Sequence, residues 1–152
     1  MTMDETDRRI LRALQKQGRI SNADLSEQVN LAPSACHRRV QRLAAAGAIA
    51  GYVALLSPRA LGVPATIFVE ITLQAQADEV LEAFETAVRR IPNVLECHLM
   101  AGTADYILKI VAEDTEDFAR IHRQYLTRLP GVAQMQSSFS LRSVCATTAL
   151  PV

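Results

Sequence analysis

Residues 31–43 read LAPSACHRRVQRL, and this stretch decides the fold of the first part of the chain. At about 100° per residue, Cys36, Val40 and Leu43 fall on one side of a helix, and most of the arginines fall on the other. The stretch therefore predicts a helix over 33–46 that has an apolar inner face and a basic outer face.

The charge around this helix is uneven. No acidic residue lies between Glu27 and Glu70, although carboxylates make up 16 of the 152 residues. Residues 1–60 carry nine basic and five acidic side chains, a net charge of +4, whereas 61–152 carry seven and eleven, a net charge of −4. Such asymmetry indicates that the first part binds a polyanion. A basic, solvated face on an ordinary helix is the alternative explanation.

Two shorter helices are expected upstream. Asp4 with Asp7 and Ser21 with Asp24 have the spacing of helix-capping pairs. Three helices joined by short turns form a helix-turn-helix, whose third helix is the candidate recognition helix. Arginine can pair with guanine and glutamine with adenine in the major groove. The candidate DNA-binding residues are Ser34, His37, Arg38, Arg39, Gln41 and Arg42.

The segment after this helix separates two domains. Residues 49–56 are rich in strand formers and predict a short wing or hairpin. Residues 57–64 contain two prolines and a glycine, which favour a hinge. We therefore predict a winged helix-turn-helix domain over 1–56, a linker over 57–64 and a second domain over 65–152.

The second domain has a different hydrophobic period. Apolar residues alternate from Ile67 to Leu73, which is typical of a strand, and similar signals recur later in the chain. We expect helices over 77–91 and from Asp114, and further strands over 94–100, 106–111 and 132–144. This βαββαβ order predicts a ferredoxin-like α+β fold with both helices on one face of an antiparallel sheet. Both sides of several strands are partly apolar, so we expect the other face to pack on another subunit.

Several classes of protein are disfavoured. The three cysteines are an odd number without CxxC spacing, so neither a disulfide framework nor a metal site is expected. No apolar run reaches the roughly 18 residues that span a bilayer. The chain opens with acidic residues and not with a basic, apolar signal sequence. The sequence therefore predicts a cytoplasmic protein that does not enter a membrane.

Seven ordered motifs run along nearly the whole chain. They are Asp4-x-x-Asp7-x-x-Ile10-Leu11, Gly18-Arg19, Leu31-x-Pro33-x-x-Cys36-x-x-Arg39-Val40-x-x-Leu43, Gly47-x-Ile49-x-Gly51-Tyr52, Gly102-x-x-Asp105-Tyr106, Leu129-Pro130-Gly131-Val132 and Thr147-Thr148-Ala149-Leu150-Pro151. Together they resemble the Lrp/AsnC (leucine-responsive/asparagine-responsive regulator) family of prokaryotic transcriptional regulators. The resemblance implies a hinge strand between the domains, dimers that pair through their sheets and assemble further into octamers, and an amino-acid effector between sensor domains.

The resemblance also implies which residues hold the effector. They are Met100, Ala101, Gly102, Thr103, Asp105, Tyr106, Gln134, Gln136 and Ser137. Glycine at 102 lets backbone N–H groups approach a carboxylate, and Asp105 can accept a hydrogen bond from an α-ammonium group. A plain hairpin turn would also explain residues 102–105. Two positions depart from the family: Ala32 replaces a serine N-cap, at a cost of about 1 kcal/mol, and Met135 replaces a polar residue.

These signals favour a sequence-specific DNA-binding regulator whose assembly or DNA affinity responds to a small amino acid. Its operator would be double-stranded and pseudo-palindromic. No catalytic residue and no cofactor is expected. One alternative is an enzyme of the same architecture, similar to sirohaem decarboxylases. A tetrapyrrole pocket needs convergent His and Arg side chains, and the second domain offers only His98 and His122 as histidines. A sensor module without DNA is the other alternative, and the helix-turn-helix argues against it.

Overall fold

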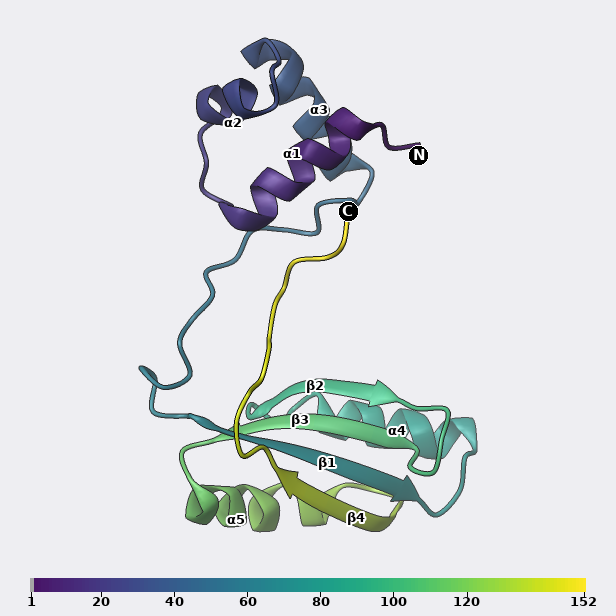
Figure 1. Ribbon diagram of the computed structural model, residues 1–152. Coiled ribbons are helices and arrows are strands. Elements are labelled where there is room, and N and C mark those ends of the chain that lie inside the picture. Colours follow the sequence, from purple (N-terminus) through teal and green to yellow (C-terminus); the bar gives the residue numbers. More distant parts are fainter. Residues whose placement is uncertain (1) are drawn as a thin grey trace. The chain divides into compact units, whose positions relative to one another are not determined.

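The protein is described by a computed structural model that covers residues 2–152 (Figure 1). The chain divides into two compact units, and the division falls between Leu55 and Leu56. Cys145–Val152 groups with the N-terminal unit, whereas the sequence assigned these residues to the second domain. No helix of the described residues is long and apolar enough to cross a membrane.

The N-terminal unit contains three helices, which agree closely with the sequence. They are α1 (Glu5–Lys16), α2 (Asn22–Gln28) and α3 (Pro33–Ala45). The predicted capping pairs are confirmed: Asp4 and Asp7 cap α1 reciprocally, and the Ser21 side chain accepts from the backbone N–H of Asp24. The core of the unit is a cluster of buried side chains from all three helices: Ile10, Leu11, Leu25, Val29, Cys36 and Leu43.

The start of α3 has no side-chain cap, because Ala32 stands at the N-cap position. A different contact fastens this end of the helix. The amide of Asn22 donates to the carbonyl oxygen of Pro33 at 2.9 Å, which ties the start of α2 to the first turn of α3. Such a bond contributes about 1 kcal/mol, so it offsets part of the missing cap.

The last residues of the chain form a strap on α1. The side-chain amide of Gln15 donates to the carbonyl oxygen of Leu150 at 3.0 Å and accepts from its backbone N–H at 2.5 Å. The guanidinium of Arg12 donates to the backbone oxygen of Val152 at 2.6 Å. Val152 also packs against the apolar core of the unit. These contacts explain why the strap joins the N-terminal unit.

The predicted wing is wrong for the described chain, because no residue between α3 and Ala65 is in a strand. Residues 49–56 run as an extended connection, and Tyr52, Val53 and Leu55 are exposed. A strand needs a neighbour to satisfy its backbone hydrogen bonds, and no described segment pairs with this one. A propensity for strand was therefore not sufficient.

The second unit is the predicted ferredoxin-like βαββαβ fold. Its elements are β1 (Ala65–Leu73), α4 (Asp78–Val88), β2 (Val94–Leu99), β3 (Tyr106–Ala112), α5 (Thr115–Gln124), a 3₁₀ turn η1 (Leu126–Arg128) and β4 (Val132–Phe139). The four strands are antiparallel in the order β2-β3-β1-β4. The last strand ends at Phe139, five residues before its predicted end.

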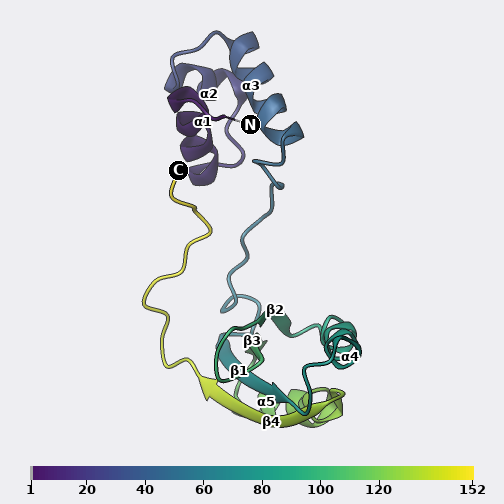
Figure 2. The ribbon, with the colours of Figure 1, turned by 90° about the vertical axis from the view of Figure 1, so that its right-hand side faces the viewer.

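The two faces of the sheet differ in their cover. The helices α4 and α5 lie on one side of the sheet (Figure 2). Ile67, Val69 and Ile71 are fully buried in one cluster with side chains of these helices. The alternate residues Phe68 and Glu70 point to the other side and are exposed. Because successive strand residues face opposite ways, the second side is open along the described chain.

Candidate DNA-binding and effector sites

The outer face of α3 presents four of the predicted DNA-binding residues to solvent. Ser34, His37, Arg38 and Gln41 are all exposed, whereas Cys36 is completely buried on the opposite face. The helix has no acidic residue in its first turn. Among the described residues, Arg38 has no carboxylate within 4.0 Å of its side-chain nitrogens. This face therefore offers one arginine without a carboxylate partner among other hydrogen-bonding groups.

The other two predicted arginines lie against α1. A guanidinium nitrogen of Arg39 lies 2.7 Å from a carboxylate oxygen of Asp4 and 2.8 Å from one of Asp7, and Arg42 lies 2.5 Å from the second oxygen of Asp7. The side chain of Asp7 is 1 % exposed, compared with 29 % for Arg39 and 50 % for Arg42. The hydrogen bond from the Asp7 backbone N–H and the Arg39 guanidinium hold the pKa of Asp4 below its ordinary value. The sequence grouped these arginines with Arg38, but the fold gives them carboxylate partners within the domain.

The predicted effector loop connects β2 to β3. The backbone N–H of Met100 donates to the carbonyl oxygen of Asp105 at 2.8 Å and closes the loop. Met100, Ala101, Gly102 and Thr103 are exposed. Gly102 does not have a left-handed φ, and a Cβ added there would meet no atom within 4 Å. The fold therefore does not require glycine at this position, although the loop contains one.

Asp105 lies beneath the loop and is 7 % exposed. One carboxylate oxygen accepts from the backbone N–H of Leu73 at 2.7 Å, and the other accepts from the side-chain amide of Gln76 at 2.6 Å. Both oxygens therefore already have one donor each inside the fold, and the role of Asp105 in binding an ammonium group stays a prediction. Asp105 fastens the loop to the end of β1. Gln76 was missed because it lies 29 residues away in the sequence and in no motif.

Tyr106 also serves the fold first, because it is 1 % exposed. Its hydroxyl donates to a carboxylate oxygen of Glu85 at 2.8 Å, and its ring lies 4.6 Å from that of Phe84. Burial, and then the bond to Glu85, raise the pKa of Tyr106 far above its ordinary value. Tyr106 therefore joins the start of β3 to α4, and its direct contact with an effector stays a prediction.

The three polar residues predicted on the last strand do not share one face. Gln134 pairs with Thr72 and Gln136 with Glu70, so both lie on the open side of the sheet. Ser137 pairs with the buried Val69 and therefore points to the helix side. β1 separates β4 from β3, so Gln134 and Gln136 are two strands away from the effector loop of the same chain. One chain alone does not bring the predicted effector residues into a single cluster.

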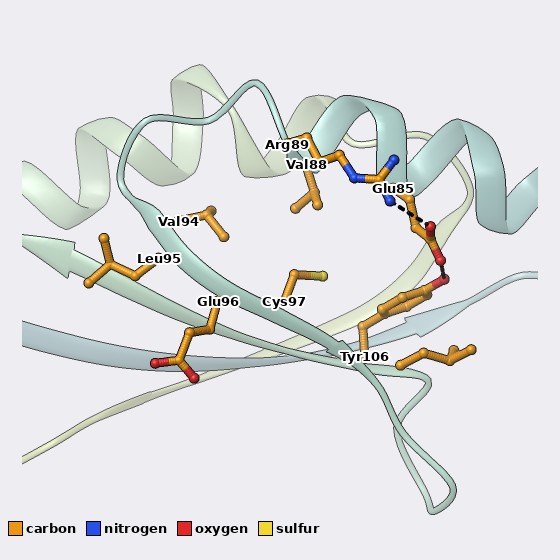
Figure 3. A pocket seen from close by; sticks show the side chains of 9 residues that line it. Glu85, Val88, Arg89, Val94, Leu95, Glu96, Cys97 and Tyr106 are labelled. Atoms are coloured by element: carbon orange, nitrogen blue, oxygen red, sulfur yellow. Dashed lines mark hydrogen bonds and ion pairs between the residues drawn. The ribbon is translucent and has the colours of Figure 1, made fainter. Parts of the chain in front are cut away.

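A cavity of about 400 Å³ lies between α4 and β2, beside the effector loop (Figure 3). Its apolar wall includes Val88 and Cys97, and its polar end is Glu85, which binds the Tyr106 hydroxyl and an Arg89 guanidinium nitrogen at 3.2 Å. Burial raises the pKa of Cys97 to about 11, so its thiol stays protonated at neutral pH. The charged groups at this polar end are thus paired with one another.

Residues with metal-binding side chains do not gather elsewhere in the described part of the chain: no group of three or more His, Cys, Asp or Glu side chains is placed to hold an ion. The cysteines at 36, 97 and 145 are all free thiols.

Comparisons with known proteins match both units. Residues 3–44 match the model of the AsnC-type helix-turn-helix domain, and residues 66–150 match that of the Lrp/AsnC ligand binding domain. The chain is 47% identical to the leucine-responsive regulatory protein of Escherichia coli K12 over 130 residues, which cover 86% of this chain and 79% of that protein. The Klebsiella pneumoniae protein of the same name is 46% identical over the same shares.

Two solved structures are similar over almost the whole chain. A transcriptional regulator of Neisseria meningitidis in complex with L-Met has a TM-score of 0.94 at 39% identity, covering 99% of this chain and 97% of that one. An AsnC family transcriptional regulator of Agrobacterium tumefaciens has a TM-score of 0.94 at 33% identity, covering 98% and 97%.

Proposed function

The chain belongs to the Lrp/AsnC family of transcriptional regulators, and from this premise we propose which residues carry its two activities. It is a DNA-binding regulator with an amino-acid ligand-binding domain, and it is not an enzyme, because its relatives are named as regulators. The sirohaem-decarboxylase alternative is therefore abandoned. A regulator of this kind meets its operator on the chromosome, so we place its action in the cytoplasm.

We propose that the exposed face of α3 reads the operator through Ser34, His37, Arg38 and Gln41. The single observation that supports this proposal best is the exposed guanidinium of Arg38, which has no carboxylate partner among the described residues, on a helix that itself contains no acidic residue. Arginine donates two parallel hydrogen bonds to guanine, and the hydroxyl of Ser34 suits a phosphate. Each bidentate contact contributes about 1–3 kcal/mol to discrimination between bases.

The matching experiment compares two charge-removing variants in a mobility shift on the DNA upstream of the gene. Arg38→Ala is expected to weaken specific binding by roughly 10-fold or more, in line with about 1–3 kcal/mol for one bidentate contact. Arg120→Ala is the control, because it removes the same charge from α5, where Arg120 pairs with Asp117. Equal binding by both variants would refute the assignment.

We propose that the effector is a small amino acid with an aliphatic or thioether side chain. Support comes from the relatives, of which one is called leucine-responsive and another was solved with L-Met. The exposed backbone of residues 101–103 supplies N–H donors for a carboxylate, and Gly102 leaves room for the ligand to approach that backbone closely. Calorimetry with each of the twenty amino acids tests this proposal, and heat from none of them would refute it.

The family forms oligomers, and we propose that a second copy covers the open face of the sheet. This face exposes the large ring of Phe68, and it also carries Ile107 and Val111 on the strand beside it. Gln134 and Gln136 lie on the same face, so the effector site is completed only when chains assemble.

We propose that dimers then assemble into an octamer. Light scattering of Phe68→Asp, which is expected to yield monomers, tests the pairing; an unchanged mass would refute it.

A further inference from the structure

Asp7 is a buried carboxylate that neither the DNA-reading face nor the effector loop uses. It lies in the first turn of α1 with 0 % of the residue exposed. One of its oxygens accepts from Arg39 at 2.8 Å, and the other accepts from Arg42 at 2.5 Å and from the backbone N–H of Asp4 at 3.3 Å. A buried charge is tolerated only when it is paired and hydrogen-bonded. Asp7 meets this requirement by binding two arginines of another helix.

The two arginines restrict how α3 can turn. Arg39 and Arg42 are three residues apart, so they lie side by side on one flank of the helix. Arg38 lies about 100° around the helix axis from Arg39. Because one carboxylate binds both arginines, rotation of α3 about its own axis would break at least one charge-assisted hydrogen bond. The same two hydrogen bonds therefore help to keep Ser34, Arg38 and Gln41 facing outward.

The cluster also settles which charges are available to DNA. Arg39 and Arg42 are balanced by Asp4 and Asp7, so the four side chains together carry no net charge. Only Arg38 of the three arginines on α3 is left with its charge unbalanced among the described residues. Binding of a polyanion scales with unbalanced cations, because each phosphate that is neutralised releases counterions.

We propose that Asp7 is a positioning residue for DNA recognition, which locks α3 in its reading orientation and withholds Arg39 and Arg42 from the phosphates. The proposal goes beyond the DNA-binding function, because it assigns α1 a part in selectivity. In this proposal Arg38 contacts DNA, whereas Arg39 and Arg42 bind Asp7 and hold the helix in place.

The salt dependence of DNA binding tests this division. Each phosphate contact contributes about −0.9 to the slope of log affinity against log salt concentration. Asp7→Asn keeps the size of the side chain and leaves the cluster one positive charge in excess. On a random-sequence duplex, this variant is expected to bind more tightly, with a slope steeper by about 0.9 per recognition helix. On a duplex selected from a random pool by the wild-type protein, it is expected to bind several-fold more weakly.

A residue with only a structural role would give a different result. Loosening of the domain would weaken binding to both duplexes without steepening the slope, and this outcome would overturn the proposal. Asp7→Glu restores the negative charge and is expected to return the slope to the wild-type value.

Three arginine variants decide the question even where Asp7→Asn fails to fold. Arg38→Gln is expected to weaken binding to the selected duplex by roughly 10-fold or more, because it removes one bidentate contact to a base. Arg39→Gln and Arg42→Gln are expected to leave the slope unchanged, although the first turn of α1 loses a partner in each. A slope shallower by about 0.9 per recognition helix in either variant would show a phosphate contact and overturn the proposal.

Discussion

Replacement of Asp105 by alanine tests whether the effector loop is held from below. The carboxylate is 7 % exposed and accepts from the Leu73 backbone N–H at 2.7 Å and from the Gln76 amide at 2.6 Å. Removal of the acceptor leaves the buried Leu73 N–H unsatisfied, which costs about 1–3 kcal/mol. Loss of the second, charge-assisted bond adds about 1 kcal/mol. We therefore expect Asp105→Ala to lower the free energy of unfolding by about 2–4 kcal/mol.

Asparagine at the same position is the matched control. Its side-chain oxygen can still accept from the Leu73 N–H, and its amide can donate to Gln76 once that amide has turned over. Only the charge assistance is lost, so Asp105→Asn is expected to cost about 1 kcal/mol.

Urea unfolding, followed by circular dichroism, measures both variants. A change of 1 kcal/mol shifts the melting temperature of a domain of this size by about 4–8 °C, so thermal unfolding gives an independent value. The reasoning is refuted if alanine stays within about 0.5 kcal/mol of the wild type, the range of ordinary surface substitutions. It is also refuted if asparagine is as harmful as alanine. Either result would mean that the loop is held by other contacts.

Two glycines and one ion pair give further predictions. Gly131→Ala is expected to destabilise by more than about 1 kcal/mol, since Gly131 has φ 73 and the new Cβ would lie 2.7 Å from Val80 Cγ1; unaltered melting would contradict this. Gly102→Ala is expected to melt like the wild type yet bind the effector more weakly in calorimetry, because only the ligand would meet the methyl group. The hydrogen bond from Lys109 holds the pKa of Glu96 below its ordinary value. The pair therefore stabilises the folded state at a pH above the ordinary pKa of a glutamate, and this contribution is lost as the pH falls through the lowered pKa. Glu96→Gln should therefore weaken the pH dependence of unfolding in acid, and an identical pH profile would count against the pairing.

Local patterns were sufficient for most of the secondary structure. The capping residues Asp4 and Ser21 mark the starts of two helices, and both caps form. The alternation of Ile67, Val69 and Ile71 predicts which side of β1 is buried, and all three are fully buried. These features depend on neighbours within a few residues along the chain. They were therefore predictable from spacing alone.

The candidate sites were predicted less completely, because their contacts join distant parts of the chain. Arg39 carries the same chemistry as Arg38, and only the approach of α1 distinguishes them. Asp105 was expected to face a ligand, but Gln76 and the end of β1 occupy its oxygens. Ser137 was grouped with Gln136, although neighbours in a strand point to opposite faces of the sheet. The register of β4 was needed to separate them.

The sequence by itself determined the class of this protein: a basic helix-turn-helix, a βαββαβ unit and the ordered motifs of one regulator family. Periodicity, capping and turn chemistry involve residues that lie close together in the sequence, so one sequence is sufficient to predict them. Only the tertiary structure decided which residues of the same type have different roles. Arg38 faces solvent while Arg39 and Arg42 share the buried Asp7, 32 and 35 residues away. The physical reason is that the availability of an arginine depends on whether a carboxylate lies next to it. These carboxylates come from a segment that is distant in the sequence, so the spacing of residues does not predict the contact.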